Sequence, residues 1–402
     1  MNRARRGFGL LIAASVGALV GAVSVLGLEG WSRETGPRVR DRPPAAPHLA
    51  ERPNRVAPRT SILLAWAPGG LPAGAEAVVE RTPGVRSATT VTTDLDWAER
   101  VRGEDGTVLD APAAGYRIPL DVALVEPSEY ARFVPPSERP AILGLKPGEA
   151  VIARTEAALR GGGPGLSIDV GSRVWAVEAE VSDSAANGYE VVGTGPVPED
   201  WVSPYRYVLA RVERRARPAV IERRLKRLLA PGQRLRIRAQ GETPFLRYGD
   251  AVLPQLLLKR TFGEFAARPL PSGGLEIEPG WRSRNIRPAR VPILGRVVCH
   301  RALIPQLRDA LNAVDEAELA YTIDAGDFGG CYSPRFISSN VNGRLSHHSW
   351  GIAFDLNVSD NAFGTAADQD HRLVTIMEEH GLTWGGRWLI PDGMHFEWIR
   401  FP

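Results

Sequence analysis

The 402-residue chain has little cysteine, little methionine and almost no excess of charge of either sign. It contains only two cysteines, Cys299 and Cys331, so a zinc site built from cysteine ligands is excluded. Both lie in the C-terminal part of the chain. There they either pair, as two cysteines outside the cytoplasm can, or stay as buried free thiols.

The near balance of charge limits the kinds of partner that the chain can be expected to bind. The chain has 49 Lys and Arg against 46 Asp and Glu, a formal net charge of +3, which argues against a dedicated nucleic-acid binder. The basic residues are densest from Arg211 to Leu229. This run predicts a solvated helix face, and contact with anionic wall polymer or lipid headgroups is the alternative.

The first 28 residues read as a membrane segment. Arg3, Arg5 and Arg6 precede an uncharged apolar run from Gly7 to Leu28 that is long enough to span a bilayer. The basic flank should stay cytoplasmic, so the bulk of the chain should be extracytoplasmic. An uncleaved, single-pass anchor in the cell membrane is favoured over a cleaved signal peptide, and both interpretations export the rest of the chain.

Composition and periodicity divide the remainder into a linker and two folded regions with an α+β character. "SILLAWA" and "YEVVGTGPV" predict strands, and "AVIERRLKRLLAPGQRLRIRAQG" predicts a basic helix, a stop and a strand. The expected divisions are the anchor 1–28, a Pro/Arg-rich linker 29–60, an α+β domain 61–266, a second linker 267–295 and a C-terminal domain 296–402.

The C-terminal region has its own pattern of elements. "HRALIPQLRDALNAVDE" places Leu303, Leu307, Leu311 and Val314 on one helical face. "AELAYTIDAG" predicts a strand, "GIAFDLNV" another, and "DQDHRLVTIMEEHG" a helix that stops at its glycine. A last strand is expected in the closing segment.

Histidine and aspartate gather in two short stretches of this region. In "SHHSWGIAFD" either His347 or His348 lies a few residues before Asp355, and in "DGMHFEW" His395 follows Asp392 by three residues. A catalytic zinc site needs three His or carboxylate ligands, with one position left for water. It also needs a nearby carboxylate that takes and returns a proton.

The two stretches resemble the motifs of the zinc D-Ala-D-Ala carboxypeptidase and L-Ala-D-Glu endopeptidase family. "SHHSWGIAFD" fits its Ser-x-His-x-x-Gly-x-Ala-x-Asp signature, and "WGGRWLIPDGMHFEW" is similar to its closing Trp-Gly-Gly and Asp-x-x-His-Phe motif. The resemblance covers roughly residues 296–401. It implies the fold shared with hedgehog and lysostaphin-type zinc domains, a small antiparallel sheet flanked by helices.

The resemblance also implies roles. Its register makes His348, Asp355 and His395 the ligands of a Zn²⁺ cofactor, and Asp392 the catalytic acid and base. Arg335 in "GGCYSPRF" resembles the arginine that steadies the substrate carbonyl, with a structural salt bridge as the alternative. Ser346 fixes the loop or touches substrate.

Two functions of different class follow. The first is a membrane-anchored, extracytoplasmic zinc metallopeptidase acting on peptidoglycan stem peptides. The second is a non-catalytic cell-wall peptide-binding or envelope scaffold protein, in which residues 61–266 bind an envelope protein partner. "GLKPGEAVIA" and "YEVVGTGPV" are also similar to extracytoplasmic domains of bacterial ABC-type permeases, but no Walker motif accompanies them, so transport is not implied.

Overall fold

The computed structural model describes residues 60–402, with the exception of residues 214, 215 and 252. The predicted anchor, residues 1–28, and all but the last residue of the predicted linker 29–60 therefore lie outside the described residues. None of the helices within the described part of the chain combines the length and the apolar character that a membrane span requires.

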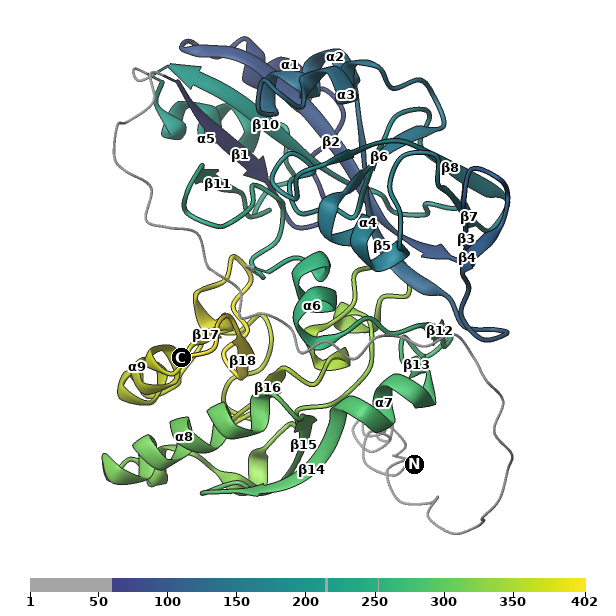
Figure 1. Ribbon diagram of the computed structural model, residues 1–402. Helices are drawn as coiled ribbons and strands as arrows, with labels where there is room; N and C mark the ends of the chain where they lie inside the picture. The colour runs from purple at the N-terminus through teal and green to yellow at the C-terminus, as the bar shows by residue number, and fades with distance from the viewer. Residues whose placement is uncertain (1–59, 214–215, 252) are drawn as a thin grey trace, which may run out of the picture. The chain divides into compact units, whose positions relative to one another are not determined.

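An 11-stranded mixed sheet dominates the first half of the described chain (Figure 1). All eight residues of its central strand β5 are buried, as expected for a strand covered on both faces. Most neighbours run antiparallel, but β5 pairs with β9 and β6 with β8 in parallel. The spatial order is β11 (Arg236–Ala239), β1 (Thr60–Trp66), β10 (Tyr205–Glu213), β2 (Val85–Ala98), β5 (Ile118–Val125), β9 (Val191–Gly193), β6 (Glu149–Ala153), β8 (Arg173–Val181), β7 (Ser167–Val170), β3 (Arg100–Arg102) and β4 (Val108–Asp110).

Short helices cover both faces of this sheet, and the strand period of two explains how. In β1, Leu63 packs in a cluster with α1 (Ala75–Glu80) and α5 (Pro218–Lys226). Its neighbour Leu64 faces the opposite side, in a cluster with α2 (Pro127–Tyr130) and α3 (Arg139–Leu143). The strand–helix–strand predictions for this half are therefore confirmed in outline.

The C-terminal elements surround a three-stranded antiparallel sheet in the order β16-β18-β17. The predicted amphipathic helix is α8, and Leu303, Leu307, Leu311 and Val314 on its inner face are fully buried. The α+β class with a small antiparallel sheet near the C-terminus is thus confirmed. These elements are α8 (Leu303–Glu316), β16 (Ala353–Asp355), α9 (His371–Glu379), β17 (Leu382–Trp384) and β18 (His395–Trp398).

Two expectations for the C-terminal half differ from the structure. The strand predicted for "AELAYTIDAG" is wrong, because this segment forms the 3₁₀ turns η2 (Ala320–Thr322) and η3 (Ala325–Asp327). The expected linker 267–295 contains regular elements whose apolar side chains join the C-terminal core. They are β12 (Ala267–Pro269), β13 (Leu275–Ile277), α7 (Pro279–Asn285) and β14 (Ile286–Val291), the last paired with β15 (Gly295–His300).

Helix α6 (Gln255–Phe262) lies between the large sheet and the C-terminal elements (Figure 1). Leu256 packs with the sheet cluster, whereas Leu258 and Phe262 pack with the C-terminal cluster. The described residues of both halves belong to one compact unit, which is not divided further. The domain limits inferred from the sequence therefore stay a prediction.

Candidate metal centre

Three side chains that the sequence singled out converge in the C-terminal sheet. Asp355 ends β16 and lies directly opposite His395, the first residue of β18, in the antiparallel register. His348 comes from the 3₁₀ turn η5 (His347–Ser349), which precedes β16. The hydroxyl of Ser346 begins this turn by accepting a hydrogen bond from the His348 amide. A short sheet and a capped turn therefore bring together residues 47 positions apart.

The three ligand atoms form a nearly equilateral triangle. His348 Nε2 lies 3.2 Å from His395 Nδ1 and 3.2 Å from Asp355 Oδ1, and the His395–Asp355 separation is 3.1 Å. Atoms bound at 2.0–2.1 Å to one tetrahedral zinc ion would lie about 3.3 Å apart. The observed triangle is therefore of the size that a zinc ion requires.

The outer nitrogen of each histidine has its own partner. His348 Nδ1 donates to the carbonyl of Cys331 at 2.9 Å, and His395 Nε2 lies 3.2 Å from a carboxylate oxygen of Glu397. Since a carbonyl can only accept, the proton of neutral His348 must sit on Nδ1, which leaves the Nε2 lone pair toward the centre. Carboxylates and carbonyls behind the histidines are the usual outer contacts of metal ligands.

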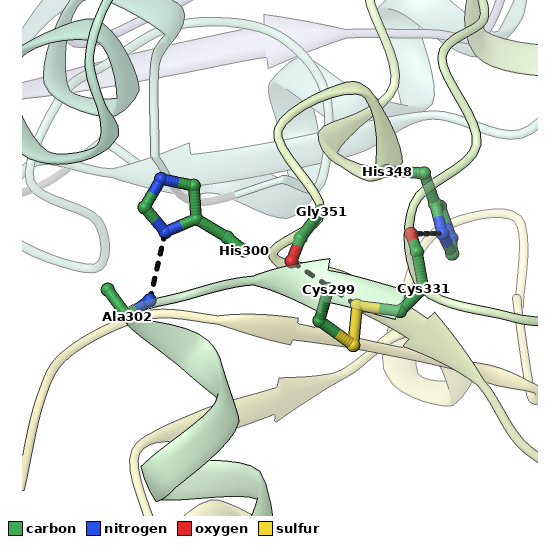
Figure 2. The surroundings of a disulfide bond; sticks show 6 residues. All are labelled: Cys299, His300, Ala302, Cys331, His348 and Gly351. Carbon is green, nitrogen blue, oxygen red and sulfur yellow. Dashed lines mark hydrogen bonds between the residues drawn. A yellow bond between two sulfur atoms is a disulfide. The ribbon is translucent and has the colours of Figure 1, made fainter. Parts of the chain in front are cut away.

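A disulfide fixes the carbonyl that holds His348. The two cysteines pair as Cys299–Cys331, which joins β15 to the loop before η5. Figure 2 shows the bond beside the Cys331 carbonyl and the His348 ring. The sequence left open whether the two cysteines pair or stay as free thiols, and the structure shows them paired. The bond also holds the loop whose Cys331 carbonyl contacts His348.

Two glycines allow the chain to pass close to these residues. Gly351 has a φ of 67°, and a Cβ there would stand 2.8 Å from the backbone nitrogen of His300. Gly329 leaves no space for a side chain either, because a Cβ would lie 2.9 Å from the Cβ of Asp355. The turn between His348 and Asp355, and the support behind Asp355, both depend on glycine.

The three side chains are buried and strongly coupled. Burial lowers the pKa of His348 and so favours the neutral ring that binds metal. Burial also opposes charge on His395, but hydrogen bonds to Asp355 and Glu397 outweigh it and raise the pKa of His395 to about 10. In the absence of a cation, a proton on His395 is what balances these two carboxylates. A bound cation would replace that proton.

Asp392 lies in the turn before β18 and lines the same cavity as the three ligands. Its backbone is held by hydrogen bonds with Gly385 and His395. The Oδ1 atom is buried and has no hydrogen-bond partner among the described residues. Burial raises the pKa of Asp392 to about 6, which suits a group that takes and returns a proton near neutral pH.

Arg335 and Ser346 also line the cavity. The guanidinium of Arg335 lies 3.9 Å from Asp355 Oδ2, so the salt bridge considered for it exists as a long contact. The buried hydroxyl of Ser349 contacts both the amide and the carbonyl of Arg335 at 3.1 Å, which ties this arginine to the histidine turn. Substrate contacts by Arg335 and Ser346 stay predictions.

Glu397 is a site residue that the sequence analysis does not single out. Its Oε2 lies 2.7 Å from His347 Nδ1 and also faces His395, so His347 belongs to the support of the site and not to the ligand triangle. A signal was present in "HFEW". Residues two apart on a strand share a face, and a buried glutamate beside a histidine needs a partner.

The geometry defines a His–Asp–His centre that could hold a metal ion, with a free carboxylate nearby. The family described as D-alanyl-D-alanine carboxypeptidase matches residues 340–398, which confirms the resemblance read from the two motifs. The matched segment includes all three candidate ligands and Asp392 but not Arg335. The match suggests a peptidase of the D-Ala-D-Ala carboxypeptidase type, a family whose peptidases are zinc-dependent.

The comparisons with whole proteins add little. A comparison with curated proteins gives no match. Among solved structures, the periplasmic region of MacB from Actinobacillus actinomycetemcomitans is similar with a TM-score of 0.29 and 10% sequence identity, over 44% of this chain and 87% of that chain. Similarity at this level assigns neither a fold nor a function.

Proposed function

We propose that the chain is a zinc metallopeptidase that hydrolyses peptidoglycan stem peptides, as a D-Ala-D-Ala carboxypeptidase or an L-Ala-D-Glu endopeptidase. The observation that carries the proposal is the triangle of His348, Asp355 and His395, with edges of 3.1–3.2 Å, inside the segment that matches the carboxypeptidase family. The finer fold assignment, a hedgehog or lysostaphin-type zinc domain, is part of the same proposal.

The donor set fits zinc, since two imidazoles and one carboxylate leave a fourth position open for water. A zinc ion held by these side chains supplies the Lewis acid for peptide hydrolysis and lowers the pKa of water toward ~7. Asp392 takes the proton from the attacking water and later gives it to the leaving amine. Its raised pKa of about 6 supports this double role.

Arg335 donates to the carbonyl oxygen as negative charge develops on it. One such donor is worth about 3 kcal/mol in the transition state. Glu397 and the Cys331 carbonyl orient the two histidines, which keeps their inner lone pairs directed at one point. The two histidines and Glu397 are buried, which strengthens the interactions between them.

The cellular setting is proposed on the sequence of residues 1–28. Their apolar run and basic flank favour a single-pass anchor in the cell membrane with the bulk of the chain extracytoplasmic. Peptidoglycan stem peptides are then the partner in reach, an envelope protein is a candidate partner of residues 61–266, and no nucleic-acid partner is proposed.

Product analysis by mass spectrometry tests the proposal. The full chain, loaded with zinc, is incubated with stem peptides beside His395→Ala, which loses a ligand, and Asp392→Asn, which keeps all three ligands. Loss of terminal D-Ala identifies a carboxypeptidase, and release of L-Ala from D-Glu an endopeptidase. Neither variant should give product, and only Asp392→Asn should retain one zinc per chain.

The opposite outcome is equally informative. If the wild type holds one zinc per chain but releases no product from any stem peptide, the peptidase proposal fails. The non-catalytic peptide-binding protein then becomes the better description of the chain.

A further inference from the structure

The cavity that contains the metal centre has a second wall outside the family-matched segment. The volume of the cavity is about 710 Å³. The candidate ligands line one side of the cavity, and residues of the sheet part, residues 60–254, line the other. Trp66 at the end of β1, Tyr205 at the start of β10 and Tyr248 after β11 belong to this second wall. A peptide bound at the metal centre would therefore also contact the sheet part.

Two tyrosine rings and the guanidinium of Arg344 stack on one another where the two walls meet. The rings of Tyr205 and Tyr248 stack with centroids 3.7 Å apart and planes at 12°. The guanidinium of Arg344 lies 4.4 Å from the centroid of Tyr248. A Cβ on Gly249, whose φ is 91°, would collide with that guanidinium, so the group also rests on the Gly249 backbone. The guanidinium is therefore held in place without an ion pair.

Arg344, which lies in the family-matched segment, differs from Arg247 of the second wall. The buried Arg247 is paired with Asp121. For Arg344, no described carboxylate oxygen lies within 4.0 Å of its nitrogens. The charge of Asp250 is close enough to interact, but its Oδ1 is paired with Arg236 and its Oδ2 accepts from the Leu389 amide at 2.6 Å. The donors of Arg344 are thus free for a ligand.

The residues that line the cavity also include Trp66. The indole of Trp66 is only 4% exposed, and its Nε1 has no hydrogen-bond partner within the described residues. A buried N–H without an acceptor is costly, so a bound molecule that supplies an oxygen gains from this site. A fixed planar guanidinium is best suited to a carboxylate, which it can bind through two parallel hydrogen bonds.

We propose that the two walls together form a specificity subsite, in which Arg344 of the family-matched segment, backed by Tyr248 of the sheet part, binds a carboxylate of the peptide substrate and Trp66 of the sheet part donates to a carbonyl oxygen of the same peptide. This inference rests on the proposed peptidase function for the identity of the ligand. It gives Tyr248 and Trp66, which lie outside the family match, a role in substrate binding. In a stem peptide the carboxylate is either that of the internal D-Glu or that of the C-terminus.

Calorimetric binding to the full chain, loaded with zinc, tests the subsite. The Asp392→Asn background prevents turnover, and three matched stem peptides serve as probes: one unmodified, one amidated at the internal D-Glu and one amidated at the C-terminus. Amidation of the carboxylate that Arg344 binds should weaken binding about 10- to 100-fold. The affected peptide identifies which of the two carboxylates is bound.

Variants separate the subsite from a general effect on folding. Arg344→Gln should remove the discrimination between the affected peptide and the unmodified one, and Arg344→Lys should restore only part of it because lysine lacks the planar fork. Arg296→Gln, an exposed arginine of β15 away from the cavity, is the matched control.

The outcomes distinguish this inference from the proposed function. Equal loss of all three peptides in Arg344→Gln, no effect of either amidation, or no binding at all would overturn the subsite. Hydrolysis by the zinc-loaded wild type is measured separately on the unmodified peptide. Arg344-dependent binding without hydrolysis keeps the subsite and rejects the peptidase, whereas hydrolysis without Arg344 dependence does the reverse.

Discussion

Two buried polar clusters of this protein both contain carboxylates but differ in the groups that face these carboxylates. In the cluster at α6, Lys259 Nζ lies 2.8 Å from Glu190 and 3.0 Å from Glu264, and Arg160 of α4 (Arg154–Arg160) lies 2.9 Å from Glu156. The Lys259 and Glu190 side chains are completely buried. At the candidate metal centre, two histidines and an aspartate face one another, and among the described residues the contact of an arginine with this aspartate, from Arg335, is long at 3.9 Å.

The difference indicates two separate roles. The Lys259 cluster contains cations of the chain itself, Lys259 and Arg160, which pair with Glu156, Glu190 and Glu264 and join α6 to the sheet. Its carboxylates outnumber these two cations, and burial raises the pKa of Glu190 to about 8. The histidine cluster directs lone pairs toward one point and relies on a proton or an added cation for compensation. Buried carboxylates paired with lysine and arginine of the chain indicate a structural role, whereas buried histidines and a carboxylate without such close partners indicate a ligand.

The largest expected difference between the two clusters is in the effect of zinc on stability. Zinc at 1,000 times its Kd should stabilise the wild type by about 4 kcal/mol, because the ion binds only the folded centre. His395→Ala should lose this stabilisation and at least about 1,000-fold in peptidase activity. Thermal unfolding with zinc and with a chelator measures the first effect. A zinc-dependent rise in Tm that persists in His395→Ala would place the binding site elsewhere.

Breaking the other cluster should cost stability regardless of zinc. Lys259→Met leaves the surrounding glutamates without their central cation and should destabilise the fold by about 3–5 kcal/mol. The matched control is Lys226→Met in α5, an exposed residue paired with Glu222, with an expected change of about 0.5 kcal/mol. Urea unfolding with and without zinc gives both values. A loss below about 1 kcal/mol for Lys259→Met would mean that the cluster does not hold α6.

The same contrast explains which features of the fold and of the candidate site could be predicted from the sequence. The resemblance of two short motifs to a zinc-dependent family predicted that His348, Asp355 and His395 lie together, and the structure brings these three side chains together. The amphipathic helix α8 was equally readable, because its leucines repeat with the helical period. Both signals lie within short stretches of sequence, so they can be recognised without knowledge of the rest of the fold.

What the sequence did not predict depends on contacts between distant segments. Lys259 pairs with Glu190 across 69 positions, and no spacing rule connects them. "AELAYTIDAG" has strand-forming residues but finds no strand partner, and forms 3₁₀ turns instead. Segment 267–295 is rich in proline and glycine, yet Trp281 and Ile286 bury there, so tertiary packing overrides composition.

His300 provides a buried histidine that is satisfied without any metal. Its Nδ1 accepts from the Ala302 amide at 3.1 Å (Figure 2), and its Nε2 lies 3.2 Å from the Phe262 carbonyl. Burial lowers its pKa to about 4, against 6.5 in the unfolded chain. The unfolded state therefore binds more protons between these values, and stability should fall by about 3 kcal/mol as pH drops from about 6.5 to 4.

His300→Asn keeps an acceptor near Ala302 but does not titrate, so its stability should lose this component of the pH dependence. Urea unfolding in chelator from pH 4.5 to 8 measures the difference between wild type and variant. The exposed His371, replaced by Asn, is the control and should leave the curve unchanged. Parallel curves for wild type and His300→Asn would show that His300 titrates normally in the folded state.

The smallest effect is expected behind the metal centre. Glu397→Gln keeps the size of the side chain but removes the negative charge that faces His395 Nε2 and His347 Nδ1. Outer partners of this kind change metal affinity by about 10- to 100-fold, so zinc binding should weaken by that factor while the fold is retained. Competition with a chelator of known affinity measures it, with the exposed Asp360→Asn as control. An unchanged zinc affinity would mean that Glu397 serves packing alone, and that the two buried clusters differ only at the ligands themselves.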